Sequence, residues 1–374
     1  MSSNLVYPFM CYWENHNGTQ SLLSAGIFSE MREREQAYDA SANLREFKPE
    51  YFKLVLDDMV TDTGVNVLFH AAVYAIDTDA RRVKGVSVMT NAGSMQFSAD
   101  FFIDATGDGN LIALAGCDYQ LGRESDGLCQ PMTTCFRMSG VDLRLYAQEH
   151  AALNDLWKQA QERGEITNPR ENILTMTGIG EGILHFNTTR IVKHDPTDPF
   201  AVSRAEITAR KQVHEIVCFL KKNSKAFANS TLISIATEIG VRESRKLKGV
   251  HILTADELKD MTPFADSIAV GNYDIDIHNP SGTGTYIYRF KDGERFKIPY
   301  RSLVPKEYDN LLVAGRCLSA THEAQAAVRI MPICACLGQA AGTAVSVAHH
   351  TGTTVHTVDI KAVQEILKAN GAEI

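Results

Sequence analysis

The chain has 374 residues, a length that allows one large domain or two moderate ones. Its formal net charge is −8 and no basic run offsets it, so we expect no nucleic-acid partner. The eight cysteines form neither a CxxC pair nor a zinc-like set, which is typical of reduced thiols in a cytoplasmic protein. We therefore expect a cytoplasmic location, no metal site and no membrane partner.

The first third of the chain carries helix and strand signals but no glycine-rich nucleotide turn. No strand, GxGxxG turn and helix occur in the first twenty residues. Helices are predicted from Gly26 and over 49–61, where apolar residues recur at helical spacing. Strands are predicted over 65–76, 83–90, 94–97 and 101–105, and the last of these leads into Ala105-Thr106-Gly107-Asp108.

The central part of the chain mixes strands and helices. Helices are predicted over 141–162 and 202–222, and Thr254 with Glu257 predicts a short capped helix. Strands are predicted over 183–192, 232–239, 268–277, 285–290 and 295–300. This pattern predicts a substrate or cap domain over 126–299 that interrupts another domain.

The clearest pattern lies between Leu311 and Ala348. A short apolar strand ends at Gly315, a polar loop follows, and a helix rich in small residues begins near Pro332. Gly338 and Gly342 lie four residues apart on this helix, so we expect it to approach another backbone closely. The positive end of the helix could face a group that becomes negative, such as a reduced flavin. A final amphipathic helix is predicted over 359–369.

The sequence LLVAGRCLSATHEAQAAVRIM followed by GQAAG resembles the C-terminal flavin-binding segment of FAD-dependent oxidoreductases of the glutathione-reductase type. Within that type, it most resembles the segment of a bacterial FAD-dependent oxidoreductase family. The strand that delivers Ala-Thr-Gly resembles the part of those proteins that returns to the FAD domain. The resemblance implies an α/β fold, with a Rossmann-like FAD/NAD(P)-binding domain over 1–125 and 300–374 and an inserted α+β substrate domain over 126–299. It implies FAD as the cofactor, with contacts at Ala105, Thr106, Gly107, Asp108, Gly315, Arg316, Ala326, Ala327, Met331 and Gly338.

The resemblance fails at the start of the chain. Proteins of this type begin with a strand, a GxGxxG turn and a helix that hold the FAD pyrophosphate. The sequence as given resembles a chain that starts about one βαβ unit later. We therefore expect weaker FAD binding, and a partner chain or a homo-oligomer that supplies the missing unit.

Three residues are candidates for catalysis. The strand around Asp276 and His278 alternates polar and apolar residues, so the two polar side chains share one side with Asp274. A histidine beside carboxylates could accept the proton of a substrate hydroxyl, although a structural histidine or, less readily, a metal ligand set fits the same pattern. His322 and Arg329 precede the flavin-facing helix, where the arginine could stabilise a reduced flavin or an acidic substrate, or only fix the loop.

Substrate binding is predicted for Arg242, Glu243 and Asp276. Arg242 and Glu243 follow a strand, where a guanidinium could bind a carboxylate or a sugar hydroxyl, or form a structural pair. The sequence thus predicts an FAD-dependent oxidoreductase that transfers hydride from a small polar substrate, with a hydroxyl-bearing molecule favoured. The alternative is a non-catalytic fragment, or a subunit of a split flavoprotein that needs a partner chain.

Overall fold

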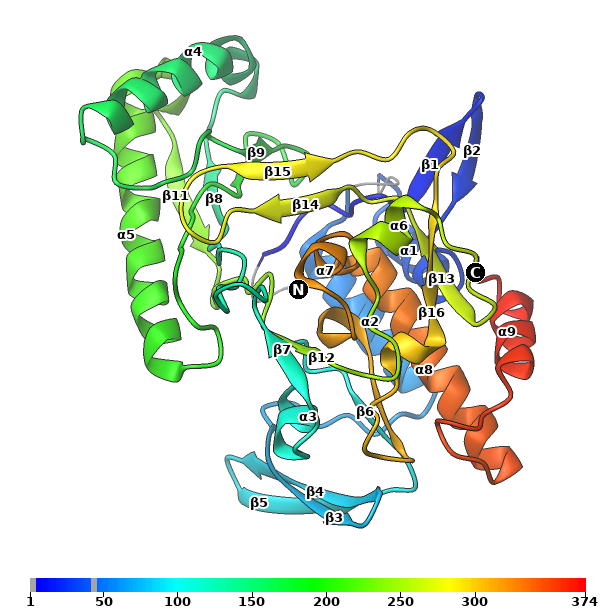
Figure 1. The fold of residues 1–374 in the computed structure, drawn as a ribbon. Coiled ribbons are helices and arrows are strands. Elements are labelled where there is room, and N and C mark those ends of the chain that lie inside the picture. Colours follow the sequence, from blue (N-terminus) through cyan, green and yellow to red (C-terminus); the bar gives the residue numbers. More distant parts are fainter. Residues whose placement is uncertain (1–4, 42–45) are drawn as a thin grey trace.

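The computed structural model describes residues 5–41 and 46–374 (Figure 1). The helices are α1 (Ile27–Tyr38), α2 (Pro49–Asp62), α3 (Asn110–Leu114), α4 (Leu143–Glu162), α5 (Pro199–Asn223), α6 (Ala255–Lys259), α7 (His322–Val328), α8 (Met331–Thr351) and α9 (Ile360–Ala369). The strands are β1 (Trp13–His16), β2 (Thr19–Leu22), β3 (Ala72–Asp79), β4 (Arg82–Thr90), β5 (Gly93–Ser98), β6 (Phe102–Asp104), β7 (Tyr119–Leu121), β8 (Phe136–Ser139), β9 (Thr175–Met176), β10 (Leu184–Phe186), β11 (Thr231–Ile235), β12 (Arg245–Leu247), β13 (Ser267–Gly271), β14 (Ile275–His278), β15 (Thr285–Tyr288), β16 (Phe296–Pro299) and β17 (Leu311–Val313).

The strands form several small sheets. The largest has the order β11-β8-β10-β9, and β3, β4 and β5 form an antiparallel meander. β17 pairs in parallel with β6, so that Leu311 lies opposite Phe102 and Val313 opposite Asp104. The β14–β15 hairpin runs across the top of the view in Figure 1, between the α4–α5 part and the rest of the molecule. The chain therefore has a mixed α/β fold.

Helices α4 and α5 belong to the core that includes the largest sheet. Asp198 caps α5 by accepting hydrogen bonds from the backbone amides of Phe200 and Ala201, and Pro199 occupies its first turn. The buried residues of α5 recur at helical spacing from Ala201 to Leu220. Those from Val213 to Leu220 pack with Trp157 of α4 and with the inward side chains of the sheet, whereas Ala205 and Ala209 belong to a small separate cluster. This core spans residues 136–227 of the chain.

A second core surrounds β17 and α8. It combines β6 and α3 from the first third of the chain with segments from residue 247 onward, including β13, β16 and α9. Leu311, Leu312 and Val313 are fully buried there, which confirms the strand predicted from the apolar run. Residues from 247 to 298, which we predicted as part of the inserted domain, thus pack with the C-terminal segment.

Most predicted helices are confirmed, including the capping box in which Thr254 and Glu257 bond to each other's backbone amides at the start of α6. Three strand or loop predictions are wrong. Residues 65–71 are not a strand, and β3 begins only at Ala72. The strand predicted over 268–277 is split into β13 and β14. The loop around His322 is the helix α7, which Thr321 caps through the amide of Ala324.

Helix α8 runs through the centre of the molecule (Figure 1). Its length and apolar composition would suffice to cross a membrane, but half of its apolar stretch is buried in the fold, as in the core helix of a globular protein. Gly338 and Gly342 lie on its exposed side, and a Cβ atom added at either position would meet no atom within 4 Å. The close backbone approach predicted for these glycines is therefore absent from the described part of the chain.

Candidate functional site

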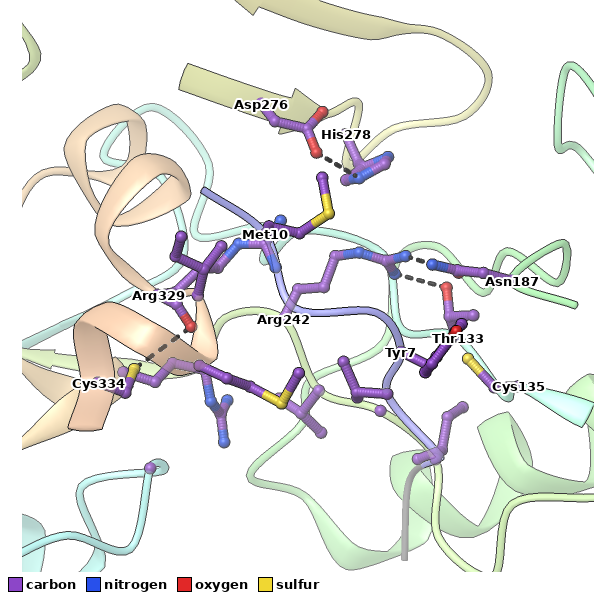
Figure 2. Close-up of a pocket in the computed structure, with 18 of the residues that line it drawn as sticks. Tyr7, Met10, Thr133, Cys135, Asn187, Arg242, Asp276, His278, Arg329 and Cys334 are labelled. Atoms are coloured by element: carbon purple, nitrogen blue, oxygen red, sulfur yellow. Dashed lines mark hydrogen bonds and ion pairs between the residues drawn. The ribbon is translucent and has the colours of Figure 1, made fainter. Parts of the chain in front are cut away.

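One large cavity, of about 1270 Å³, lies where several elements end. Its wall is formed by the loops after β6 and β17, by the first turn of α8, by the segments just before β8 and just after β10, and by β14. Figure 2 shows that Asp276 and His278 lie on one side of it, Arg329 and Cys334 on another, and Asn187, Thr133 and Cys135 on a third. The cavity therefore brings residues from both cores together.

The loop after β6 is held in shape by Asp104. Its buried carboxylate accepts hydrogen bonds from the backbone amides of Thr106 at 3.0 Å, Leu111 at 2.8 Å and Ile112 at 3.0 Å. These bonds satisfy the free amides at the start of α3, which would otherwise lack partners. They also fix the loop Ala105 to Asp108 so that its backbone faces the cavity.

Two glycines shape the loops that face the cavity. Gly107 and Gly315 have φ angles of +77° and +81°, a region that L side chains rarely adopt. A Cβ atom at Gly107 would also lie 2.9 Å from Nη2 of Arg316, whose guanidinium pairs with the carboxylate of Asp108 at 2.8 Å. These positions require glycine, and they leave backbone rather than side chains on this part of the wall.

The first turn of α8 faces the same cavity. Its N-cap residue, Ile330, provides no side-chain acceptor, so the first amides of the helix have no cap. Arg329, directly before Ile330, has a buried Nε that no hydrogen-bond partner in the described part of the chain reaches. Cys334 points at the backbone of Arg329, with 3.4 Å between its Sγ and that carbonyl oxygen. This end of α8 is thus a positive region that no described side chain neutralises.

His278 is buried between basic and acidic partners. Its Nδ1 lies 3.1 Å from Nη2 of Arg190, and its Nε2 lies 3.2 Å from Oδ2 of Asp276. Because a guanidinium can only donate, Nδ1 must accept, and Nε2–H then donates to Asp276. His278 is therefore neutral, with both ring nitrogens engaged.

Burial and the charge of Arg242 lower the pKa of His278 to about 3, although Asp276 opposes the shift. Burial works against ionisation of Asp276 as well. Hydrogen bonds from His278 and Tyr273, together with the charge of Arg329, nevertheless hold the pKa of Asp276 below its usual range. Asp276 is therefore a fixed negative charge beside a neutral imidazole.

Arg242 lies in the centre of the view in Figure 2. Its Nη1 donates to the carbonyl oxygen of Pro131 at 2.6 Å and to Oγ1 of Thr133 at 2.5 Å, and its Nη2 donates to Oδ1 of Asn187 at 3.3 Å. All three acceptors are neutral. The segment before β8 and the residue after β10 therefore position this guanidinium without neutralising it.

Glu243 and His322 lie behind the cavity wall. The buried carboxylate of Glu243 pairs with Nζ of Lys246, accepts from the amide of Gln130 at 2.9 Å and lies 2.7 Å from Nδ1 of His322. A fully buried carboxylate needs such partners. The network joins β12, α7 and the segment before β8, so Glu243 has a structural environment, with Lys246 and His322 as partners in place of the arginine pairing considered from the sequence.

The predicted site residues thus divide into two groups. Those that line the cavity are Ala105, Thr106, Gly107, Asp108, Arg242, Asp276, His278, Gly315, Arg316, Arg329 and Met331. Those outside its wall are Glu243, His322, Ala326, Ala327 and Gly338. In residues 5–41 and 46–374, no group of three or more His, Cys, Asp or Glu residues is placed to hold a metal ion.

Sequence reasoning missed Asp104, Arg170 and Arg190. An acidic residue at the end of a buried strand, just before a glycine turn and a helix, is a local signal that could have indicated the capping role of Asp104. Arg190 lies 88 positions from His278 and Arg170 lies 108 positions from it, so only the tertiary fold brings them together.

The cavity fits a flavin at the end where β6, β17 and α8 meet. Glycines at positive φ leave the backbone open there, the first turn of α8 is uncapped, and the buried Nε of Arg329 lacks a partner. Such a wall suits an extended, polar and partly anionic cofactor. Fold and site together define a flavoprotein class. The family model described as FAD dependent oxidoreductase matches residues 1–367, and the chain belongs to this family, whose cofactor is FAD.

Comparison with curated proteins gave no match. Among solved structures, a geranylgeranyl bacteriochlorophyll reductase-like protein from Thermoplasma acidophilum has 11% identity and a TM-score of 0.41, over 86% of this chain and 58% of that one. The anhydrotetracycline hydroxylase OxyS from Streptomyces rimosus has 11% identity and a TM-score of 0.34, over 83% and 49%. The L-proline dehydrogenase from P. horikoshii has 12% identity and a TM-score of 0.34, over 92% and 68%. The chain spans about half the length of the first two, and similarity at this level carries no information on the substrate.

Proposed function

We propose that the protein oxidises a small polar substrate, with a hydroxyl-bearing molecule favoured, and that the hydride passes to FAD. When bound, FAD supplies the hydride acceptor. The observation that carries the proposal is that one cavity contains both the uncapped first turn of α8 and the polar side chains of Asp276, His278 and Arg242. The family match does not favour the alternative of a non-catalytic fragment or subunit.

The proposed fold is a Rossmann-like FAD domain of the glutathione-reductase type, formed by 1–125 and 300–374, with a substrate domain over 126–299. The parallel pairing of β6 with β17 supports this assignment, because both strands end at the cavity. Ala105 to Asp108 and Gly315 would hold the cofactor through their backbone. Arg329 and the backbone amides of Met331 and Ile333, on either side of Pro332, would face the reacting ring of the cofactor at the start of α8.

His278 is the proposed proton acceptor for the substrate hydroxyl. The proton would go to Nδ1, whose lone pair accepts a hydrogen bond from Arg190 in the structure. Nε2–H would remain hydrogen-bonded to the carboxylate of Asp276. The negative charge of Asp276 would then stabilise the imidazolium that forms. A substrate that displaces the hydrogen bond from Arg190 is needed for this step.

The experiment is anaerobic mixing of the FAD-loaded protein with a panel of small alcohols, polyols and hydroxy acids, followed by flavin absorbance. We expect at least one of these compounds to reduce the flavin. His278→Ala should slow reduction by about 10²–10⁴-fold, the usual effect of losing a general base, at unchanged FAD content. The matched control is His214→Ala, because His214 is exposed on α5. Reduction at the wild-type rate in His278→Ala would remove this residue from the mechanism.

A further parallel strand at the free edge of β6 also belongs to the proposal. In the described chain β6 pairs with β17 alone, so the other edge of β6 carries no strand. Parallel sheets normally lie inside a protein, covered on both faces. Val65, Val67, Leu68 and Phe69 are between 44% and 68% exposed, and Gly338 on α8 faces open space. Such surfaces are usually covered. The added unit would come from the same polypeptide, from a second copy or from a partner chain, in a protein that we place in the cytoplasm.

A further inference from the structure

Arg242 and Arg329 share an unusual position in the cavity. Both line it, and within the part of the chain that the structure describes neither forms an ion pair with a carboxylate. Arg242 has neutral acceptors only, and Nε of Arg329 is buried without any acceptor. Both side chains are half-buried, and Asp276 is a carboxylate whose charge acts on Arg242 and is stabilised by that of Arg329. Neither guanidinium has a carboxylate at ion-pair distance in the described chain, so each keeps hydrogen-bonding capacity for an anion.

The acidic residues nearby are engaged elsewhere. Asp276 lies 3.2 Å from His278 and accepts from Tyr273 at 3.0 Å. Glu171 pairs with Arg190 at 3.1 Å, and Asp108 pairs with Arg316 at 2.8 Å. Glu171 and Asp108 thus pair with other cations, as do Glu206 and Asp274 of the same wall with Arg210 and Arg289, whereas the hydrogen-bond partners of Asp276 are neutral. These contacts leave the guanidinium groups of Arg242 and Arg329 for a ligand.

The two arginines also act on each other through the cavity. Burial, and next the charge of Arg329, lowers the pKa of Arg242 to about 9. Two positive groups that repel each other in this way are stabilised when an anion binds near both. A planar carboxylate suits a guanidinium, because it can accept two parallel hydrogen bonds.

We propose that the substrate is a small hydroxy acid whose carboxylate binds to Arg242 and Arg329. This inference rests on the proposed function for the redox step and deepens it by naming the substrate class. The carboxylate would lie between the guanidinium groups of Arg242 and Arg329. The hydroxyl of the same substrate would then be left to contact His278. The protein would then recognise the charged end of the molecule with one group of residues and remove the hydroxyl proton with another.

Binding of the carboxylate would also affect the base. The charges of Arg242 and Arg329 both contribute to the low pKa of His278. An anion bound to the two arginines would offset those charges and make His278 a better proton acceptor. Neutral alcohols of the same size would lack this effect, so they should be poor substrates.

The test is calorimetric titration of the full chain, in the presence of FAD, with L-lactate, L-malate and the neutral L-lactamide. We expect at least one acid to bind, and lactamide to bind at least tenfold more weakly. Arg242→Gln and Arg329→Gln should each weaken binding of that acid by roughly tenfold or more, as expected for hydrogen bonds to a charged group. Arg144→Gln is the control, because Arg144 is exposed on α4. Arg242→Lys and Arg329→Lys keep the charge and replace any glutamine variant that fails to fold.

The proposal is wrong if neither acid binds more tightly than lactamide, or if both arginine variants bind the acid as the wild type does. Loss of FAD from Arg329→Gln at unchanged acid affinity would assign Arg329 to the cofactor and would also overturn the proposal. Calorimetry reads binding without any redox step. Failure of flavin reduction would therefore refute the proposed oxidation and leave the acid-binding result intact.

Discussion

His185 shows how the fold fixes the charge of a buried residue. It lies on β10 directly opposite Arg137 of β8, and it is fully buried. Neither of its ring nitrogens has a hydrogen-bond partner among residues 5–41 and 46–374. Burial, and next the charge of Arg137, lowers the pKa of His185 to about 3. The residue is therefore neutral in the folded protein and protonated below about pH 6.5 when the chain unfolds.

This difference predicts a dependence of stability on pH. Because the folded pKa lies below the unfolded value, the full stability is present above about pH 6.5 and falls as the pH drops from there towards 3. At pH 5 the loss from His185 is about 2 kcal/mol, at 1.36 kcal/mol per pKa unit. Urea unfolding at pH 7 and pH 5 should show that His185→Gln loses about 2 kcal/mol less than the wild type. The exposed His214→Gln is the control, and equal losses in all three proteins would show that His185 titrates normally.

At the scale of elements, two neighbouring parts of the first third of the chain are incompletely paired. β6 pairs with β17 alone in the described chain, and residues 65–71, which the sequence predicts as a strand, are exposed and outside regular secondary structure. Phe69 is 68% exposed. Unpaired strand edges and apolar segments of this kind are sites where another chain adds. The same physical features thus explain the wrong strand prediction and support the proposed further strand.

Phe69→Glu tests this surface. Because the side chain is exposed, the free energy of unfolding should change by less than about 0.5 kcal/mol. Association of the wild-type chain with itself or with a co-purifying partner should fall sharply in the variant, as measured by light scattering over a concentration series. Phe200→Glu, at a 75% exposed position on α5, should associate as the wild type does. A wild-type chain that stays monomeric and partner-free at every concentration would contradict a strand supplied by a second copy or by a partner chain.

At the scale of the whole molecule, local patterns predicted much of the fold. Apolar periodicity identified α5, the small residues after Pro332 identified α8, and the burial of Leu311 to Val313 followed from their apolar run. The resemblance to FAD-dependent oxidoreductases placed Gly107 and Gly315 near one site, Arg329 was added from its position before the flavin-facing helix, and all three line the cavity. These features depend on neighbours in sequence or on a simple connection.

Other features depend on contacts that no local pattern contains. Glu243 was expected in the substrate site, but its carboxylate is buried among Lys246, Gln130 and His322, which come from distant segments. Arg190 reaches His278 only after β10 and β14 have been placed by the two cores. Its sequence context gave no reason to select it. Long-range packing therefore decided which charged residues face the cavity.

The central claim is that FAD binds in the cavity at the start of α8. The most direct measurement is a calorimetric titration of FAD into the wild-type chain, Met331→Glu and Met89→Glu. Met331 lines the cavity in the first turn of α8, where a carboxylate suits the helix but repels an anionic cofactor. Met89 is 49% exposed on β4 and lies outside the cavity wall. We predict saturable binding of one FAD per chain, weakened at least tenfold in Met331→Glu and unchanged in Met89→Glu, with roughly 1.4 kcal/mol per factor of ten. No saturable binding, or equal affinity in all three proteins, would contradict the account.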